Sequence, residues 1–171
     1  MFKWLFGSKT DAGPAVSGTK EIIVVQQRIS APIDRAFAVF VDEFDRWWPR
    51  DRTWGKDNLA EIRIEPKHNG RCIERTKDGA TSTFGTVLTF SRPDHIVIAW
   101  QIGPKREPVD HESGASRVDV RFVEEGATTD VVIVHRDFAR HGDGWEAYKA
   151  EMASKTGWPR LIDLYAKAVG G

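Results

Sequence analysis

The residues best suited to acid–base or metal chemistry lie close together near position 135. His135, Asp137, His141 and Asp143 fall within nine residues of sequence, and all four are of types that ligate metals or transfer protons. His135 and Asp137 are two residues apart, so they would share one face of a strand. The end of a strand followed by a solvated turn explains the same pattern more simply. We therefore predict no metal site and no cofactor, and keep His135 as a candidate ligand-binding residue.

A second group of reactive types surrounds the only cysteine, Cys72. A thiol becomes a nucleophile only beside a base that lowers its pKa, and a lone cysteine in a strand is more often a small core residue. Glu74, Arg71 and Arg75 lie on one predicted strand and could act as a buried acid or an anion clamp, although surface pairing of each with residues of a neighbouring strand is the simpler interpretation. The sequence contains no glycine-rich phosphate loop and no Gly-x-Ser-x-Gly motif. No catalytic residue is predicted.

The aromatic residues are more informative, because the chain has seven Trp and nine Phe but only two Tyr. They would converge if a curved sheet wraps the last helix, and a filled core is the simplest outcome. Such a sheet can also leave an apolar cavity of roughly a few hundred Å³, the usual form of a small-molecule site. The residues predicted to line this cavity are Trp48, Glu74, Phe84, Trp100, His135, Tyr148, Trp158 and Ile162. His135 and Glu74 would be the polar groups that orient a ligand.

Length and charge exclude several classes of protein. The 171 residues fit one domain, and one cysteine excludes an internal disulfide. The 25 basic and 25 acidic residues give a formal net charge of zero, which removes the basic surface that nucleic-acid binding needs. No apolar run reaches the roughly 18 residues of a membrane span, and the first residues lack the features of a signal peptide. We expect a cytoplasmic protein with no transmembrane segment and no nucleic-acid partner.

The pattern of elements divides the chain into a tail and one domain. Residues 1–20 combine an aromatic hexamer with Gly, Ser and Pro and are predicted to be a flexible N-terminal tail, which leaves residues 21–171 as the domain. A segment docked on its own domain and a membrane-surface anchor are the alternatives for these residues. A β-rich run begins at Ile22 and stops at Pro32, because proline cannot continue a sheet ladder but suits the first turn of a helix. Apolar residues then recur at helical spacing as far as Phe44, and Pro49 prevents continuation.

The alternation of apolar and polar residues between 59 and 138 predicts a train of strands. Turn sequences separate them at residues 68–70, 77–79 and 91–94, and a polar loop spans 103–116. With no helical pattern between the strands, we expect an antiparallel meander. The chain then becomes helical. One helix covers residues 143–154, and a second, with Pro159 in its first turn, carries an apolar face that includes Ile162.

Several segments occur in an order that is typical of one superfamily. They comprise an Ala-Pro helix entry, a tryptophan-bearing second helix, a Gly-x-Val strand that turns at a proline and ends on Trp, a final strand and a closing helix. The segments are residues 29–37 (ISAPIDRAF), 44–48 (FDRWW), 69–71 (NGR), 85–100 (GTVLTFSRPDHIVIAW), 132–138 (VIVHRDF) and 157–161 (GWPRL). Over roughly residues 20–169 the chain resembles the START and pollen-allergen-like (SRPBCC) superfamily. Within it, the chain is similar to the subgroup named for the C-terminal domain of the activator of the 90-kDa heat-shock protein ATPase.

The resemblance implies an α+β helix-grip domain, in which a curved antiparallel sheet wraps a C-terminal helix and two short helices follow the first strand. It implies a cavity but no shared catalytic residues, and members of the superfamily bind lipids, polyketides or other apolar molecules. We therefore expect non-catalytic binding of a small hydrophobic or amphipathic ligand between sheet and C-terminal helix.

Two alternatives stay open. A small enzyme of cyclase, dehydratase or hydrolase type would need His135 and a carboxylate that face one cavity. A protein-interaction module with a chaperone or other protein partner would need an exposed apolar patch of several hundred Å² in round terms.

Overall fold

The computed structural model describes residues 15–19 and 21–170, with side chains described from residue 21 onward. Its strands are β1 (Ala15–Thr19), β2 (Ile22–Ile29), β3 (Leu59–Ile64), β4 (Arg71–Thr76), β5 (Thr81–Ser91), β6 (His95–Trp100), β7 (Ser116–Glu125) and β8 (Thr128–Arg136). Its α-helices are α1 (Ile33–Val41), α2 (Phe44–Trp47), α3 (Trp145–Ala153) and α4 (Trp158–Gly170). Short 3-10 helices lie in the connections: η2 (Arg50–Arg52), η3 (Lys56–Asn58), η4 (Glu112–Gly114) and η5 (Phe138–His141).

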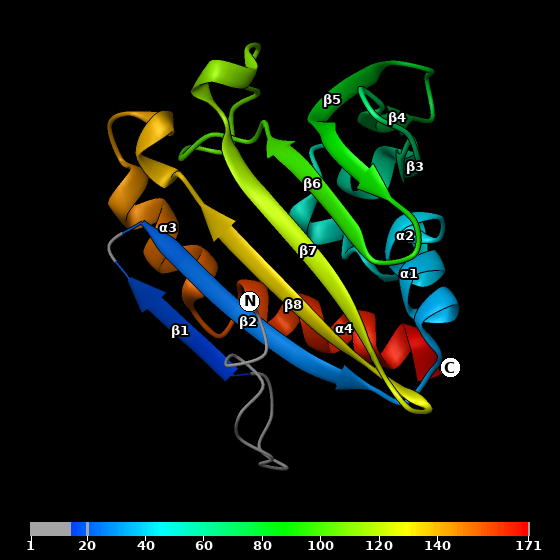
Figure 1. Ribbon diagram of the computed structural model, residues 1–171. Coiled ribbons are helices and arrows are strands. Elements are labelled where there is room, and N and C mark those ends of the chain that lie inside the picture. The colour runs from blue at the N-terminus through cyan, green and yellow to red at the C-terminus, as the bar shows by residue number, and fades with distance from the viewer. Residues whose placement is uncertain (1–14, 20, 171) are drawn as a thin grey trace.

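The eight strands of the described residues form one sheet in the order β1-β2-β8-β7-β6-β5-β4-β3. Each neighbouring pair is antiparallel, and β3 to β8 follow one another as the predicted meander. The first long strand, β2, pairs with the last, β8, so that Ile23 lies opposite His135. Figure 1 shows α4 running behind these strands, and α4 contacts β2. The fold is therefore the α+β helix-grip fold that the sequence predicts.

The first helix begins where the sequence predicts. Pro32 is the N-cap of α1 in extended conformation, and the apolar face of α1 is buried against the sheet. The apolar spacing predicts a helix as far as Phe44, but α1 ends at Val41. A two-residue turn separates it from α2, and the N–H of Glu43 closes this turn by donating to the Ala38 carbonyl at 3.1 Å.

The strand β1 departs from the prediction of a flexible tail over residues 1–20. Residues 15–19 form an edge strand that pairs with residues 22–26 of β2. Their sequence, AVSGT, has one bulky apolar residue, so the strand is specified by main-chain pairing with the edge of β2 and not by a side-chain pattern. Residues 1–14 and 20 lie outside the described residues, and a domain boundary at residue 21 stays a prediction.

One end of the core is built from tightly packed rings, which we call the phenylalanine–tyrosine cluster: Phe37, Phe40, Phe122 and Tyr165. Ring centroids lie 5.1 Å apart for Phe37 and Phe122, 5.8 Å for Phe40 and Phe122, and 5.2 Å for Phe40 and Tyr165. The Tyr165 hydroxyl donates to the Ala36 carbonyl at 2.6 Å, so the only polar atom of the cluster is hydrogen-bonded. Its rings come from α1, α4 and β7, so their contacts pack the two helices against this strand.

Within the described part of the chain, no helix is both long enough and apolar enough to cross a membrane.

Candidate functional site

Three tryptophans from three elements meet in another part of the core. Trp48 follows α2, Trp100 ends β6 and Trp158 begins α4, and each is almost completely buried. Their ring centroids lie 5.6 Å apart for Trp48 and Trp100, 6.1 Å for Trp100 and Trp158, and 6.2 Å for Trp48 and Trp158. We call this trio the tryptophan cluster. Its polar edges make it chemically different from the phenylalanine–tyrosine cluster.

A small cavity lies beside the tryptophan cluster, and we call it the pocket. Its volume is about 10 Å³, which is room for roughly one water molecule. The side chains that line it come from the segment after α2, the end of β6, the following loop and α3: Trp48, Arg52, Trp100, Ile102, Arg106, Tyr148 and Met152. The structure therefore brings together three residues that the sequence selects, Trp48, Trp100 and Tyr148.

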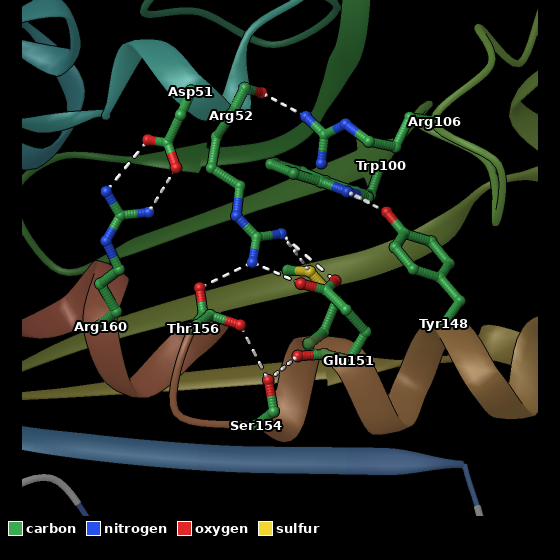
Figure 2. Close-up of polar contacts among 10 residues, drawn as sticks. Asp51, Arg52, Trp100, Arg106, Tyr148, Glu151, Ser154, Thr156 and Arg160 are labelled. Atoms are coloured by element: carbon green, nitrogen blue, oxygen red, sulfur yellow. Dashed lines mark hydrogen bonds and ion pairs between the residues drawn. The ribbon is translucent and has the colours of Figure 1, made fainter.

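Arg52 is a buried charge in the lining of the pocket, with 8% of the residue exposed. Its guanidinium donates to the two carboxylate oxygens of Glu151, at 2.5 and 3.2 Å, and to the Thr156 carbonyl at 2.6 Å (Figure 2). A buried guanidinium is tolerated only when it is paired and hydrogen-bonded in this way. Arg52 thus fastens the segment after α2 to the end of α3 and to the α3–α4 connection.

Arg106 reaches the pocket from the loop between β6 and β7. Its backbone is left-handed, with φ 62°, and the Trp54 indole N–H holds it by donating to its carbonyl at 2.6 Å. Its guanidinium donates to the Arg52 carbonyl at 2.6 Å (Figure 2). Among the described residues, no carboxylate forms an ion pair with Arg106, in contrast to Arg52.

Tyr148 and Trp100 place their polar atoms against each other at the pocket. The Trp100 indole N–H donates to the Tyr148 hydroxyl oxygen at 2.9 Å (Figure 2). The hydrogen of that hydroxyl has no acceptor among the described residues. Burial raises the pKa of Tyr148, so the phenol stays protonated and can only add a donor to the pocket.

His135 is fully buried and points into the core, beside the pocket but not among the residues that line it. The Trp158 indole N–H donates to its Nδ1 at 3.0 Å, so its proton is on Nε2. The Nε2–H then donates to Ser116 Oγ at 2.7 Å, and that hydroxyl donates to His141 Nε2 at 2.8 Å. Burial, with a smaller contribution from the charge of His141, lowers the pKa of His135 well below its usual value. The imidazole is therefore neutral at physiological pH.

Glu74 is buried, but its carboxylate binds the backbone of a loop and does not face the pocket as a group that orients a ligand. Its two carboxylate oxygens each accept a backbone N–H at 3.0 Å, from Trp54 and from Gly55. It forms no hydrogen bond with His135, so the two polar residues that the sequence selects are not paired with each other. Glu74 positions the loop that carries Trp54, which in turn holds Arg106.

The remaining sequence candidates fill the core. Phe84 stacks on Phe44 with centroids 5.7 Å apart, and Ile162 is fully buried on α4. Cys72 is fully buried, and burial raises the pKa of its thiol, which disfavours the thiolate. No cluster of three or more metal-ligating side chains occurs among the residues that the structure describes.

The sequence was then compared with known protein families. Residues 30–170 match the family described as activator of Hsp90 ATPase homolog 1-like protein. The chain belongs to this family. The search of curated proteins finds no match.

Solved structures that resemble this member of the family share its fold. The anthrahydroquino-gamma-pyrone synthase Txn09 is 24% identical with a TM-score of 0.61, and the alignment covers 88% of this chain and 99% of that one. CalC from Micromonospora echinospora, a self-sacrificing resistance protein, is 25% identical with a TM-score of 0.62, covering 87% and 94%. Protein NE0264 from Nitrosomonas europaea is 11% identical with a TM-score of 0.63, covering 90% and 97%.

The sequence indicates the aromatic part of the pocket better than its polar part. Sequence reasoning missed Arg52, Ile102, Arg106 and Met152. Arg52 lies in the charged run PRDR at residues 49–52, and Arg106 lies in a polar loop, so both resemble surface residues in sequence. Only Met152, at helical spacing from Tyr148, carries a signal that could have placed it beside the pocket.

Proposed function

We propose that the protein binds a small apolar or amphipathic molecule, without catalysis, at the pocket between the end of β6, the segment after α2 and the helix α3. The observation that carries this proposal is the composition of the lining: two indole rings and two aliphatic side chains form the walls, and two guanidiniums and a phenol lie at its edge. A mostly apolar wall with a few convergent polar groups is the usual composition of a small-molecule site.

The size of the cavity means that a ligand must displace part of the lining. The element best able to move is the N-terminal part of α3, because only two residues of α3, Tyr148 and Met152, are buried, and Glu151 ties its C-terminal end to Arg52. Methionine adapts its shape readily, since its unbranched side chain has several rotatable bonds. We expect this part of α3 to shift outward when a ligand enters, while the sheet keeps its position.

The chemistry of the buried groups favours binding over catalysis. His135 is neutral and hydrogen-bonded on both ring nitrogens, so it has no free base position. Glu74 is occupied by two backbone N–H groups. General acid–base catalysis requires groups within hydrogen-bond reach of a substrate, and neither residue lines the pocket.

The named neighbours give limited support. CalC is a resistance protein and Txn09 is a synthase, and both have the fold of this chain. Small-molecule recognition on this fold is therefore consistent with the proposal. The family description also names an activator of the Hsp90 ATPase, and a chaperone partner is the alternative if no small molecule binds.

The test is an NMR titration of isotopically labelled protein with 1-naphthalenemethanol, a neutral amphipathic probe. Saturable shifts are expected for the indole N–H signals of Trp48 and Trp100. Trp47, whose indole N–H donates to the Phe40 carbonyl, does not line the pocket but packs against Trp48, so its signal should shift less than those of Trp48 and Trp100. Absence of saturable shifts at Trp48 and Trp100 would overturn the proposal.

A pair of variants localises the binding. Met152→Ala enlarges the pocket and should tighten binding of the probe. Val169→Ala also truncates a buried side chain, but Val169 does not line the pocket, so it should leave the affinity unchanged. Equal effects of the two variants would place the probe elsewhere.

A further inference from the structure

The pocket carries an excess of positive charge. Its lining contains two guanidiniums and no carboxylate. Glu151 neutralises Arg52 through a two-pronged ion pair, whereas Arg106 donates only to the neutral carbonyl of Arg52. The nearby Glu107 does not line the pocket and accepts the N–H of Lys105 at 2.7 Å. One positive charge is therefore left without a counter-charge at the pocket.

The pocket presents donors that have few or no acceptors in the described part of the chain. The Tyr148 hydroxyl accepts from Trp100, and its own hydrogen has no acceptor there. Arg106 can only donate, because a guanidinium has no acceptor atom. The Tyr148 oxygen and the Arg52 carbonyl each already accept one hydrogen bond, from Trp100 and from Arg106. Tyr148 is 6% exposed, so a donor without an acceptor at this place carries a desolvation penalty that a ligand oxygen would remove.

We infer that the pocket is selective for a monoanionic ligand: an apolar, aromatic-sized body that carries one oxyanion, a carboxylate or a phenolate, held between Arg106 and Tyr148. This inference rests on the proposed function and gives the chemical class of its ligand. The indole walls of Trp48 and Trp100 receive the body of the ligand, and the two donors receive its oxyanion. Hydrogen bonds from a guanidinium to a carboxylate are charge-assisted and are stronger than neutral ones.

The same charges disfavour other ligands. A cation would lie next to two guanidiniums, and like charges in a partly buried site repel with little screening. A neutral alcohol can accept from Tyr148 and Arg106, but its oxygen carries no charge, so its hydrogen bond to the guanidinium is weaker than that of a carboxylate. The order of affinity expected for one apolar body is therefore anion, then neutral molecule, then cation.

Three probes with the same ring system test this order: 1-naphthoate, 1-naphthalenemethanol and 1-naphthylmethylammonium. Dissociation constants are measured for the full chain by NMR titration at neutral pH. We expect 1-naphthoate to bind about tenfold more tightly than the alcohol, and the ammonium to bind most weakly. Equal affinity of the acid and the alcohol, or preferential binding of the ammonium, would overturn the inference while the proposed function stands. Failure of all three probes would overturn the proposed function itself.

Variants assign the selectivity to Arg106. Arg106→Gln should reduce the affinity for 1-naphthoate about tenfold and leave the affinity for the alcohol unchanged within about twofold. Arg106→Lys keeps the charge and should restore part of the preference for the anion. The matched control is Arg160→Gln, because Arg160 is also close to Arg52 but pairs with the exposed Asp51 outside the pocket (Figure 2). If Arg160→Gln lowers the affinity for 1-naphthoate as much as Arg106→Gln does, the selectivity comes from general surface charge and the inference is wrong.

Tyr148→Phe tests the second donor. Removal of the hydroxyl should reduce the affinity for 1-naphthoate about threefold to tenfold and leave the affinity for the ammonium unchanged. A two-dimensional spectrum of each free variant shows whether it is folded, so that a loss of affinity is read only from folded protein. A folded Tyr148→Phe protein that binds the acid as tightly as the original would exclude the hydroxyl as a ligand contact.

Discussion

The two aromatic clusters of this core differ in how their rings pack and in how their polar atoms are hydrogen-bonded. In the phenylalanine–tyrosine cluster, apolar rings pack edge to face and the single hydroxyl donates to a main-chain carbonyl. In the tryptophan cluster, two of the three indole N–H groups have side-chain partners: that of Trp100 donates to Tyr148 and that of Trp158 donates to His135. Beside it lie two guanidiniums and a cavity. The first cluster is complete without a ligand, whereas the second leaves a donor and a charge available.

The difference indicates which end of the fold is structural and which end is functional. Rings that fill their space contribute burial and close contact, so loss of any atom there lowers stability. A mostly apolar binding site needs a few polar groups to fix the orientation of its ligand, and the polar atoms beside the tryptophan cluster could serve this purpose. We therefore expect substitutions in the two clusters to differ in both their energetic and their binding effects.

Truncation of Phe37 should give the largest effect. Phe37→Ala removes a fully buried ring that contacts Phe122, and we expect the free energy of unfolding to fall by about 3–5 kcal/mol. Met152→Ala should cost only about 2 kcal/mol, because Met152 borders a cavity and α3 can close in. Urea unfolding of both variants measures the difference. Equal losses would mean that the two ends of the core are packed alike, and the comparison would fail.

The ion pair between Arg52 and Glu151 should give the next largest effect. Glu151→Ala leaves a buried guanidinium with the Thr156 carbonyl as its main acceptor, and we expect a loss of about 2 kcal/mol. Asp51→Ala breaks the ion pair with Arg160, in which the carboxylate is 64% exposed, and should cost about 0.5 kcal/mol or less. Chemical unfolding of the two variants gives both values. A similar small loss for both would show that Arg52 is hydrated and does not fasten α3.

Much of the fold follows from the sequence because its signals are local. The alternation of apolar and charged residues specifies the faces of β7, and Pro32 fixes where β2 ends and α1 begins. The end of α1 was less predictable, since apolar spacing continues through a turn that main-chain hydrogen bonds create. β1 was not predictable, because its pairing with β2 depends on the main chain and on proximity.

The site was predictable only in its apolar part. Large aromatics at alternating or helical spacing must face the core, so Trp48, Trp100 and Tyr148 could be selected from sequence. The burial of Arg52 depends on Glu151, which lies 99 residues away, and no local pattern records such a contact. The two partners of Glu74 are backbone atoms, which no sequence pattern identifies. Polar groups in a core are therefore assigned by tertiary contacts and require a structure.

His135, which accepts a hydrogen bond from the tryptophan cluster, should make the free energy of unfolding depend on pH. The pKa of His135 is held well below its usual value in the folded protein and returns to about 6.5 on unfolding. Between these two pKa values the unfolded chain binds more protons than the folded protein does. The free energy of unfolding is therefore highest above about pH 6.5 and falls as the pH decreases. The slope has a limit of about 1.4 kcal/mol per pH unit for one such group. Burial lowers the pKa of His141 as well, so its effect has the same sign.

Unfolding curves between neutral and mildly acidic pH measure this slope. His135→Gln should flatten it, whereas Phe37→Ala should lower stability without changing the slope, because the phenylalanine–tyrosine cluster contains no group that titrates in this range. His68→Gln, at an exposed position, is the matched histidine control and should keep the slope. A slope that His135→Gln leaves undiminished would place its origin outside His135, for example in His141.

The two tyrosines give the smallest and sharpest comparison. Tyr165→Phe leaves the buried Ala36 carbonyl without its side-chain donor in tightly packed surroundings and should cost about 1–2 kcal/mol. Tyr148→Phe leaves the Trp100 N–H without its acceptor, but the adjoining cavity has room for about one water that can accept it, so we expect a loss of about 0.5–1 kcal/mol. Urea unfolding of the two variants tests this order. If Tyr148→Phe is the more destabilising, the hydroxyl supports the fold as Tyr165 does, and the pocket end of the core is structural as well.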